Sequence, residues 1–190
     1  MLQASALTYR PATAVDAPAI AALANQHTYQ QLAVAERQRG FLTGTFAAPG
    51  LAAMLASGPG QVAYYGEELA GFVINSRLAL ERYPPLVQHI GGLLPTLLFR
   101  QRPLADYRWF FYGPVLVAPA YRGQGLLQRL FGASQRALAG RYDVGIAFIA
   151  AENTASLHVH THKLGLEVVG ELEFGGTPYA VLAFEVSPRG

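Results

Sequence analysis

The hydrophobic positions of this chain recur with two periods, and the order of these periods predicts the secondary structure. Runs rich in aromatic and β-branched residues predict β-strands, and apolar residues three or four positions apart predict helices. Strands are predicted at residues 6–10, 61–65, 69–75, 107–117, 144–150, 167–174 and 179–186, and helices from residues 13–16 to the mid-thirties and at 51–56, 124–139 and 153–163. This order predicts an α/β (α+β mixed) fold, in which a mixed sheet carries helices on both faces.

Two segments interrupt this pattern. Gly113 and Pro114 lie inside the long aromatic strand at residues 107–117. Because proline has no N–H group to donate to a neighbouring strand, this pair predicts a β-bulge or a splayed edge. Residues 82–105 contain four prolines separated by leucines and follow neither period. We interpret them as an irregular or partly helical insertion over an apolar cleft, with a buried connector as the alternative.

The composition is typical of a single folded domain over residues 1–190. Hydrophobic residues make up 52% of the chain and charged residues 14%, which excludes an intrinsically disordered protein. The chain contains no cysteine, which excludes disulfides, thiolate nucleophiles and cysteine zinc sites. The net charge is only +2 and the arginines are scattered, so we expect no nucleic-acid partner. The longest apolar stretch is too short to span a membrane, and no secretory signal is visible, which predicts a cytoplasmic protein without a membrane partner.

The strongest candidate for a binding site is the glycine-rich turn at residues 121–126, between a predicted strand and a predicted helix. Glycines let the backbone approach a ligand, and the first turn of a helix offers unpaired N–H groups that suit an anion such as a pyrophosphate. Arg122 adds a positive charge at the same place. The sequence lacks both the Gly-Lys-Ser/Thr of a Walker loop and a G-x-G-x-x-G followed by an acidic residue. A plain tight turn between a strand and a helix is the alternative.

The segment from Val115 to Gly125, Val-Leu-Val-Ala-Pro-Ala-Tyr-Arg-Gly-Gln-Gly, resembles the acetyl-CoA-binding motif of the GCN5-related N-acetyltransferase (GNAT) superfamily. Arg122 and Gly125 match the family's pattern Arg/Gln-x-x-Gly-x-Gly/Ala, and Leu127 stands where Gly or Ala is usual. The later segment from Asn153 to Leu166 is similar to the family's next helix and its Leu-Gly-Phe exit, with Leu166 in place of the aromatic residue. The resemblance extends over residues 107–186.

The resemblance implies a mixed sheet of six or seven strands with about four helices and splayed central strands. It also implies the transfer of an acetyl group from acetyl-CoA to a primary amine by direct attack, without a metal. In this scheme the pantetheine of coenzyme A pairs with the strand, the pyrophosphate binds the N–H groups of the turn, and the later helix faces the coenzyme. The implied cofactor-binding residues are Val115, Leu116, Val117, Arg122, Gly123, Gln124, Gly125, Leu126, Leu127, Asn153 and Ser156. A helix N-cap is the alternative role for Asn153, and a small residue against the sheet the alternative for Ser156.

Three histidines alternate along residues 158–162. His158 and His162 share a helix face, but no third metal ligand is evident, so we predict a solvated face and no metal. His160 lies on the opposite face with Asn153 and Ser156, at a place where the family often has a tyrosine. We predict that His160 donates a proton to the leaving thiolate, with Tyr112 or water as the other candidates and a purely structural histidine as the alternative.

These observations support three hypotheses for function. The first is a GNAT N-acetyltransferase that acts on a small-molecule amine. The second is a non-catalytic acyl-CoA-binding sensor, which the unusual Leu127 and the absence of a carboxylate in the strand at residues 107–117 would fit. The third is a general phosphate-binding α/β module. The aromatic strand and the insertion predict an apolar acceptor rather than a polyamine or an aminoglycoside, and the edge of the hairpin at residues 167–186 makes a homodimer possible.

Overall fold

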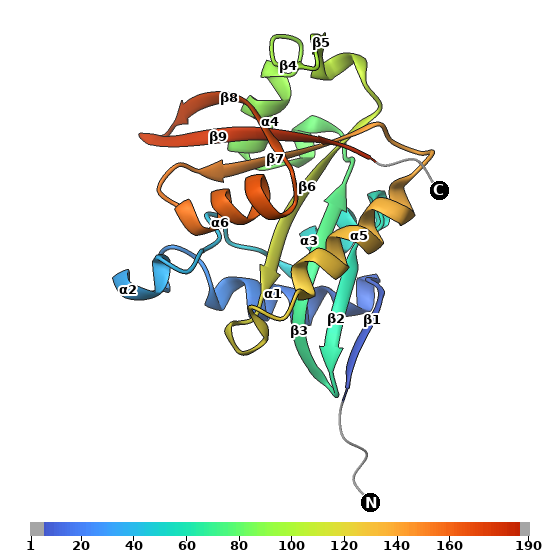
Figure 1. Ribbon diagram of the computed structural model, residues 1–190, viewed down its shortest axis with the longest axis vertical. Coiled ribbons are helices and arrows are strands. Elements are labelled where there is room, and N and C mark those ends of the chain that lie inside the picture. Colours follow the sequence, from blue (N-terminus) through green and yellow to red (C-terminus); the bar gives the residue numbers. More distant parts are fainter. Residues whose placement is uncertain (1–5, 187–190) are drawn as a thin grey trace, which may run out of the picture.

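A computed structural model describes residues 6–186 of the chain (Figure 1). The structure contains a mixed sheet of seven strands, as the sequence predicts, and their order in the sheet is β1-β2-β3-β6-β7-β9-β8. Its strands are β1 (Leu7–Pro11), β2 (Gln61–Tyr65), β3 (Glu68–Ser76), β6 (Trp109–Val117), β7 (Val144–Ala150), β8 (Glu167–Phe174) and β9 (Thr177–Glu185). The helices are α1 (Ala17–Gln26), α2 (Val34–Arg37), α3 (Ala48–Ser57), α4 (Pro85–Leu93), α5 (Leu126–Leu138) and α6 (Thr154–His158), and a π-helix (Val159–Lys163) continues α6. None of the helices in the described part of the chain is long and apolar enough to cross a membrane.

Helices cover both faces of the sheet, because the central strands bury side chains in both directions. On β3, Phe72 and Ile74 pack with α1 and α3, whereas Val73 packs with α5 on the other face. On β6, Phe111 packs with α4, whereas Tyr112 packs with α5. Every second residue of a strand points to the same face, so the apolar side chains of these strands pack into hydrophobic clusters on both sides of the sheet.

The sheet opens in its centre, between β6 and β7. These two strands pair in parallel only from Trp109 to Phe111 of β6, and beyond Phe111 they diverge (Figure 1). The predicted bulge at Gly113 and Pro114 is confirmed, because both residues lie opposite a single residue of β3 where the register shifts. Within residues 6–186, the edge of β6 that faces β7 therefore has no strand partner from Tyr112 to its end at Val117.

Residues 82–105 form α4 and a small hairpin of β4 (Leu98–Phe99) and β5 (Arg102–Pro103). Pro85 occupies the first turn of α4, where its missing N–H group costs no hydrogen bond. Ile90 and Leu94 of this segment pack against Trp109 and Phe111 of β6. The segment therefore covers one half of a sheet face.

The predicted helix from residues 13–16 to the mid-thirties is wrong in its second half. The backbone of His27 and Tyr29 instead pairs with Leu42, through the bonds Leu42 N–H to His27 O (2.9 Å) and Tyr29 N–H to Leu42 O (2.8 Å). Because of this pairing, α1 ends at Gln26. The predicted region then contains only one more short helix, α2. The helix predicted at residues 124–139 begins later, at Leu126, because Gly125 has a left-handed φ of 73°.

Candidate functional site

The turn between β6 and α5 is held in its shape by two glycines. Gly123 and Gly125 have φ angles of 76° and 73°, which residues with a side chain rarely adopt. The space over both glycines is open, since a Cβ atom at either position would meet no atom within 4 Å. No side chain caps the first turn of α5. The turn therefore offers N–H groups and open space to a ligand, as an anion site requires.

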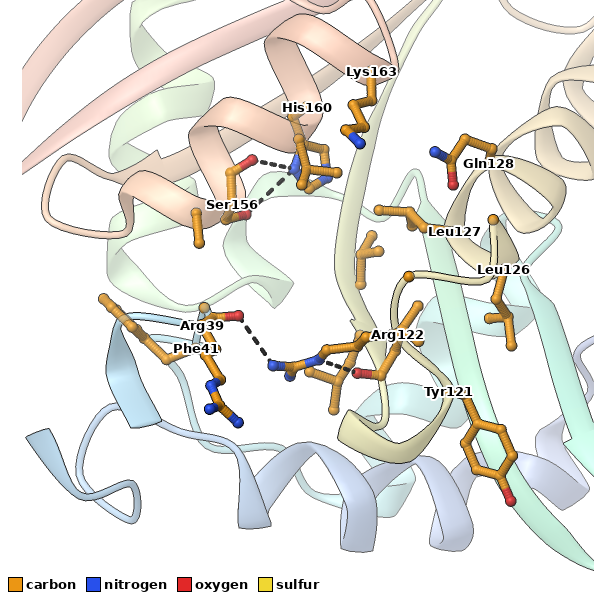
Figure 2. A pocket seen from close by; sticks show the side chains of 18 residues that line it. Arg39, Phe41, Tyr121, Arg122, Leu126, Leu127, Gln128, Ser156, His160 and Lys163 are labelled. Carbon is orange, nitrogen blue, oxygen red and sulfur yellow. Dashed lines mark hydrogen bonds between the residues drawn. The ribbon is translucent and has the colours of Figure 1, made fainter. Parts of the chain in front are cut away.

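A pocket of about 350 Å³, here named the turn pocket, lies beside this turn (Figure 2). Ten residues predicted for the site line it: Val115, Leu116, Val117, Arg122, Gly123, Gly125, Leu126, Leu127, Ser156 and His160. Eight further residues, which are not among the residues predicted for the site, also line it: Arg39, Gly40, Phe41, Tyr121, Gln128, Ala155, Val159 and Lys163. Gln124, Asn153 and Tyr112 lie outside the lining of this pocket. The pocket thus joins the strand, the turn and the later helix, as the resemblance implies.

The charges that line the turn pocket are positive. They belong to Arg39, Arg122 and Lys163, and none of the described residues that line it is acidic. The Arg122 guanidinium donates to the carbonyl oxygens of Val117 (2.9 Å) and Arg39 (3.1 Å), and Figure 2 shows it reaching across the pocket. Burial, and then repulsion by Arg39, lower the pKa of Arg122, which still leaves the side chain charged near neutral pH. Such a lining favours an anionic ligand.

Asn153 connects α6 to the loop that carries Phe41. Its side-chain oxygen accepts a hydrogen bond from the N–H group of Ser156 (3.4 Å), which makes it the N-cap of α6. Its amide nitrogen donates to the carbonyl oxygen of Phe41 (2.7 Å), and the side chain is buried. Both ends of the side chain therefore bind protein groups, and Asn153 positions residues that line the pocket.

A second space, here named the large cavity, has a volume of about 810 Å³ and adjoins the turn pocket. Most of its lining is apolar or aromatic, and it comes from residues 41–54, 76–87, 111–115, 147–160 and 174–179. Among the described residues that line the cavity, Arg82 is the only arginine or lysine, and none is acidic. Phe41, Val115, Ser156 and His160 line both spaces. A molecule in one space can therefore meet a molecule in the other at these four residues.

His160 is buried at this junction, with 7% of its surface exposed. Its Nδ1 lies 2.8 Å from the carbonyl oxygen of Ser156. Since a carbonyl oxygen only accepts hydrogen bonds, Nδ1 carries the proton, and Nε2 of the neutral ring is free to accept one. Burial lowers the pKa of His160, and the hydrogen bond to Ser156 opposes this change. The ring is therefore neutral near pH 7. The sequence predicts His160 as a proton donor, but a neutral ring must first accept a proton before it can donate one to a thiolate.

Tyr112 lies in the wall of the large cavity, with its ring 5.8 Å from that of His160. Its hydroxyl is buried and has no hydrogen-bond partner among residues 6–186. Burial raises the pKa of Tyr112, so the hydroxyl keeps its proton. A buried hydroxyl without a partner is uncommon in folded proteins, and the ring of Tyr112 packs edge-on against Phe131 and Phe184.

His158 and His162 lie on the exposed side of α6 and the π-helix, as the sequence predicts. Their rings stack at a centroid distance of 4.4 Å. Within residues 6–186, no three side chains of His, Asp or Glu come together in a way that could hold a metal ion.

Comparison with known proteins agrees with this geometry. The model of the acetyltransferase (GNAT) family matches residues 27–166 of the chain. No curated protein matches the sequence.

Solved structures with a similar fold include yncA from Salmonella typhimurium, determined with its cofactor acetyl-CoA. It has 17% sequence identity and a TM-score of 0.61, and the alignment covers 98% of this chain and 97% of yncA. The ribosomal-protein-S18-alanine N-acetyltransferase from Escherichia coli has 13% identity and a TM-score of 0.61, with 97% of each chain covered. NAA60 from Arabidopsis thaliana, in complex with a bisubstrate analogue, has 12% identity and a TM-score of 0.63, with 97% of this chain and 100% of NAA60 covered. These similarities show a shared fold.

Proposed function

Because the chain belongs to the GNAT acetyltransferase family, we propose that it transfers an acetyl group from acetyl-CoA to the primary amine of a small acceptor. The observation that carries this proposal is the junction of the two spaces at Phe41, Val115, Ser156 and His160. A thioester that enters from the turn pocket and an amine that enters from the large cavity would meet there. Bringing two reactants together in this way removes much of the entropic barrier to their reaction.

The turn pocket fits coenzyme A in three respects. The N–H groups of residues 123–127 would bind the pyrophosphate, and the positive charges of Arg39, Arg122 and Lys163 would neutralise it. The free edge of β6 offers the backbone groups of Val115–117 to the amides of pantetheine, in the way an added strand would pair. The side chain of Leu127 forms part of the pocket wall and leaves the pocket open.

The chemical step uses His160 first as a base and then as an acid. The amine nitrogen attacks the thioester carbon and forms the new C–N bond, while Nε2 of the neutral His160 takes a proton from the nitrogen. The intermediate then collapses, the C–S bond breaks, and His160 returns the proton to the coenzyme thiolate. Because Nδ1 stays bound to the Ser156 carbonyl, the ring keeps one orientation through both proton transfers.

Two measurements test this proposal. Isothermal titration calorimetry with coenzyme A reports on the turn pocket, and thiol release from acetyl-CoA with a panel of primary amines reports on transfer. We expect binding in the micromolar range and thiol release that depends on the amine. Coenzyme A binding with no thiol release for any amine would support a non-catalytic sensor, and equal binding of 3′-dephospho-coenzyme A and nucleotides without a thiol would support a general phosphate-binding module.

A further inference from the structure

The large cavity has an unusual distribution of charge. An enzyme that binds a polycationic amine needs carboxylates, but none of the described residues that line this cavity is acidic. Arg82, the one arginine among the described residues that line it, is exposed. Its backbone N–H donates to the Ala79 carbonyl oxygen (3.0 Å), but its side chain makes no hydrogen bond or ion pair with residues 6–186. Arg108, by contrast, is paired with Asp143. Arg82 is therefore a cation that is free to bind an anionic group of a ligand.

The rest of the lining describes the body of such a ligand. Phe111, Phe148 and Phe174 contribute aromatic side chains from three different strands. Pro84 and Pro85, at the start of α4, line the same cavity as Arg82. A volume of about 810 Å³ is within the range for pockets that enclose a small molecule, about 300–1,000 Å³.

From these features we infer that the acceptor is an apolar primary amine that also carries a carboxylate, which binds Arg82. Its amine lies at His160, and its apolar body lies among the aromatic side chains. This inference rests on the proposed function and names its substrate class. A carboxylate bound by a guanidinium forms charge-assisted hydrogen bonds, so its removal lowers the catalytic efficiency by about tenfold.

The experiment compares matched amines that differ only in the carboxylate. Phenylalanine and phenethylamine place the carboxylate beside the amine, and 8-aminooctanoate and octylamine place it at the far end. We expect kcat/KM with acetyl-CoA to be at least about tenfold higher for the carboxylate member of one pair or both. Arg82→Gln should reduce this preference to within twofold. Arg136→Gln should keep it, because Arg136 is also exposed but lines neither the large cavity nor the turn pocket.

Equal efficiency within each pair, or a preference that survives in Arg82→Gln, would overturn the inference. Faster turnover of spermidine than of every carboxylate-bearing amine would also overturn it. Calorimetry with N-acetylphenylalanine and N-phenethylacetamide measures the same preference without turnover. If coenzyme A does not bind at all, the proposed function fails, whereas coenzyme A binding without any effect of Arg82→Gln on the carboxylate preference in either pair contradicts only the acceptor class.

Discussion

The turn pocket and the large cavity meet at His160, but the chain builds them in opposite ways. Residues 115–128 supply more than half of the turn pocket from one continuous stretch of strand, turn and helix. The large cavity takes its lining from five stretches between residues 41 and 179. Local backbone geometry decides the first space, and the packing of distant elements decides the second. A substitution in the turn should therefore change coenzyme binding alone, and one in the cavity wall should change the choice of acceptor.

The largest effect is expected at the junction itself. His160→Phe removes the group that accepts and returns the proton, and such catalysis contributes about 10²–10⁴ to the rate. We expect kcat to fall about 100-fold, while the Kd of coenzyme A changes by less than about threefold. His158→Phe is the matched control, because His158 lies on the exposed side of the same helix and lines neither space. Near-normal turnover of His160→Phe would remove this residue from the mechanism and leave the proton to water or Tyr112.

The next effect separates the turn pocket from the large cavity. Gly125→Val places a branched side chain at a φ of 73°, over the N–H groups of the turn. We expect the Kd of coenzyme A to rise about 30-fold or more, as two charge-assisted hydrogen bonds are lost. Gly140→Val is the control for backbone strain, because Gly140 has a φ of 80° and equally open space but lies in neither lining.

Calorimetry with coenzyme A on the two folded variants shows whether the loss of affinity is specific to the turn. Unchanged affinity in Gly125→Val, or an equal loss in both variants, would contradict the assignment of the turn to the pyrophosphate. Circular dichroism of both proteins checks that the fold is kept.

A smaller effect is expected at Asn153, whose side chain binds protein groups at both ends. Asn153→Ala removes the cap of α6 and the bond to the Phe41 carbonyl. The free energy of unfolding should fall by about 1–2 kcal/mol, and the Kd of coenzyme A should stay within about threefold. Chemical denaturation and calorimetry on the same preparation measure both quantities. A tenfold loss of affinity with unchanged stability would instead show that Asn153 binds the coenzyme, as the family resemblance implies.

The smallest effect concerns the acidic limb of the pH profile. Burial lowers the pKa of His160 from its usual 6.5, so its neutral and active form persists to a lower pH. The rate is then lost as the pH falls through this lowered value, and kcat at pH 6.5 remains above half of its plateau. A pH profile of kcat at saturating amine measures this limb. An acidic limb centred above pH 6.5, or one that persists in His160→Phe, would assign it to another group.

The sequence by itself determined the parts of the site that depend on neighbouring residues. The glycine pair before a helix predicts the anion-binding turn, and Gly113 with Pro114 predicts the bulge, since both signals follow from local backbone conformation. Residues two positions apart lie on nearly opposite faces of a helix. The sequence therefore places His160 on the buried face and His158 on the exposed face. The resemblance of residues 107–186 to the GNAT family also predicts the fold, because it depends on short motifs of neighbouring residues.

Only the tertiary structure decided which distant residues complete the site. Arg39 reaches the turn pocket because Arg122, 83 positions later, binds its carbonyl oxygen. The end of α1 at Gln26 depends on pairing with Leu42, and no local signal in residues 27–33 reports that pairing. The tautomer of His160 depends on one carbonyl oxygen, and the charge of the large cavity depends on which side chains five separate stretches bring together. Periodicity shows which way a side chain faces, but long-range packing selects the side chains that it meets.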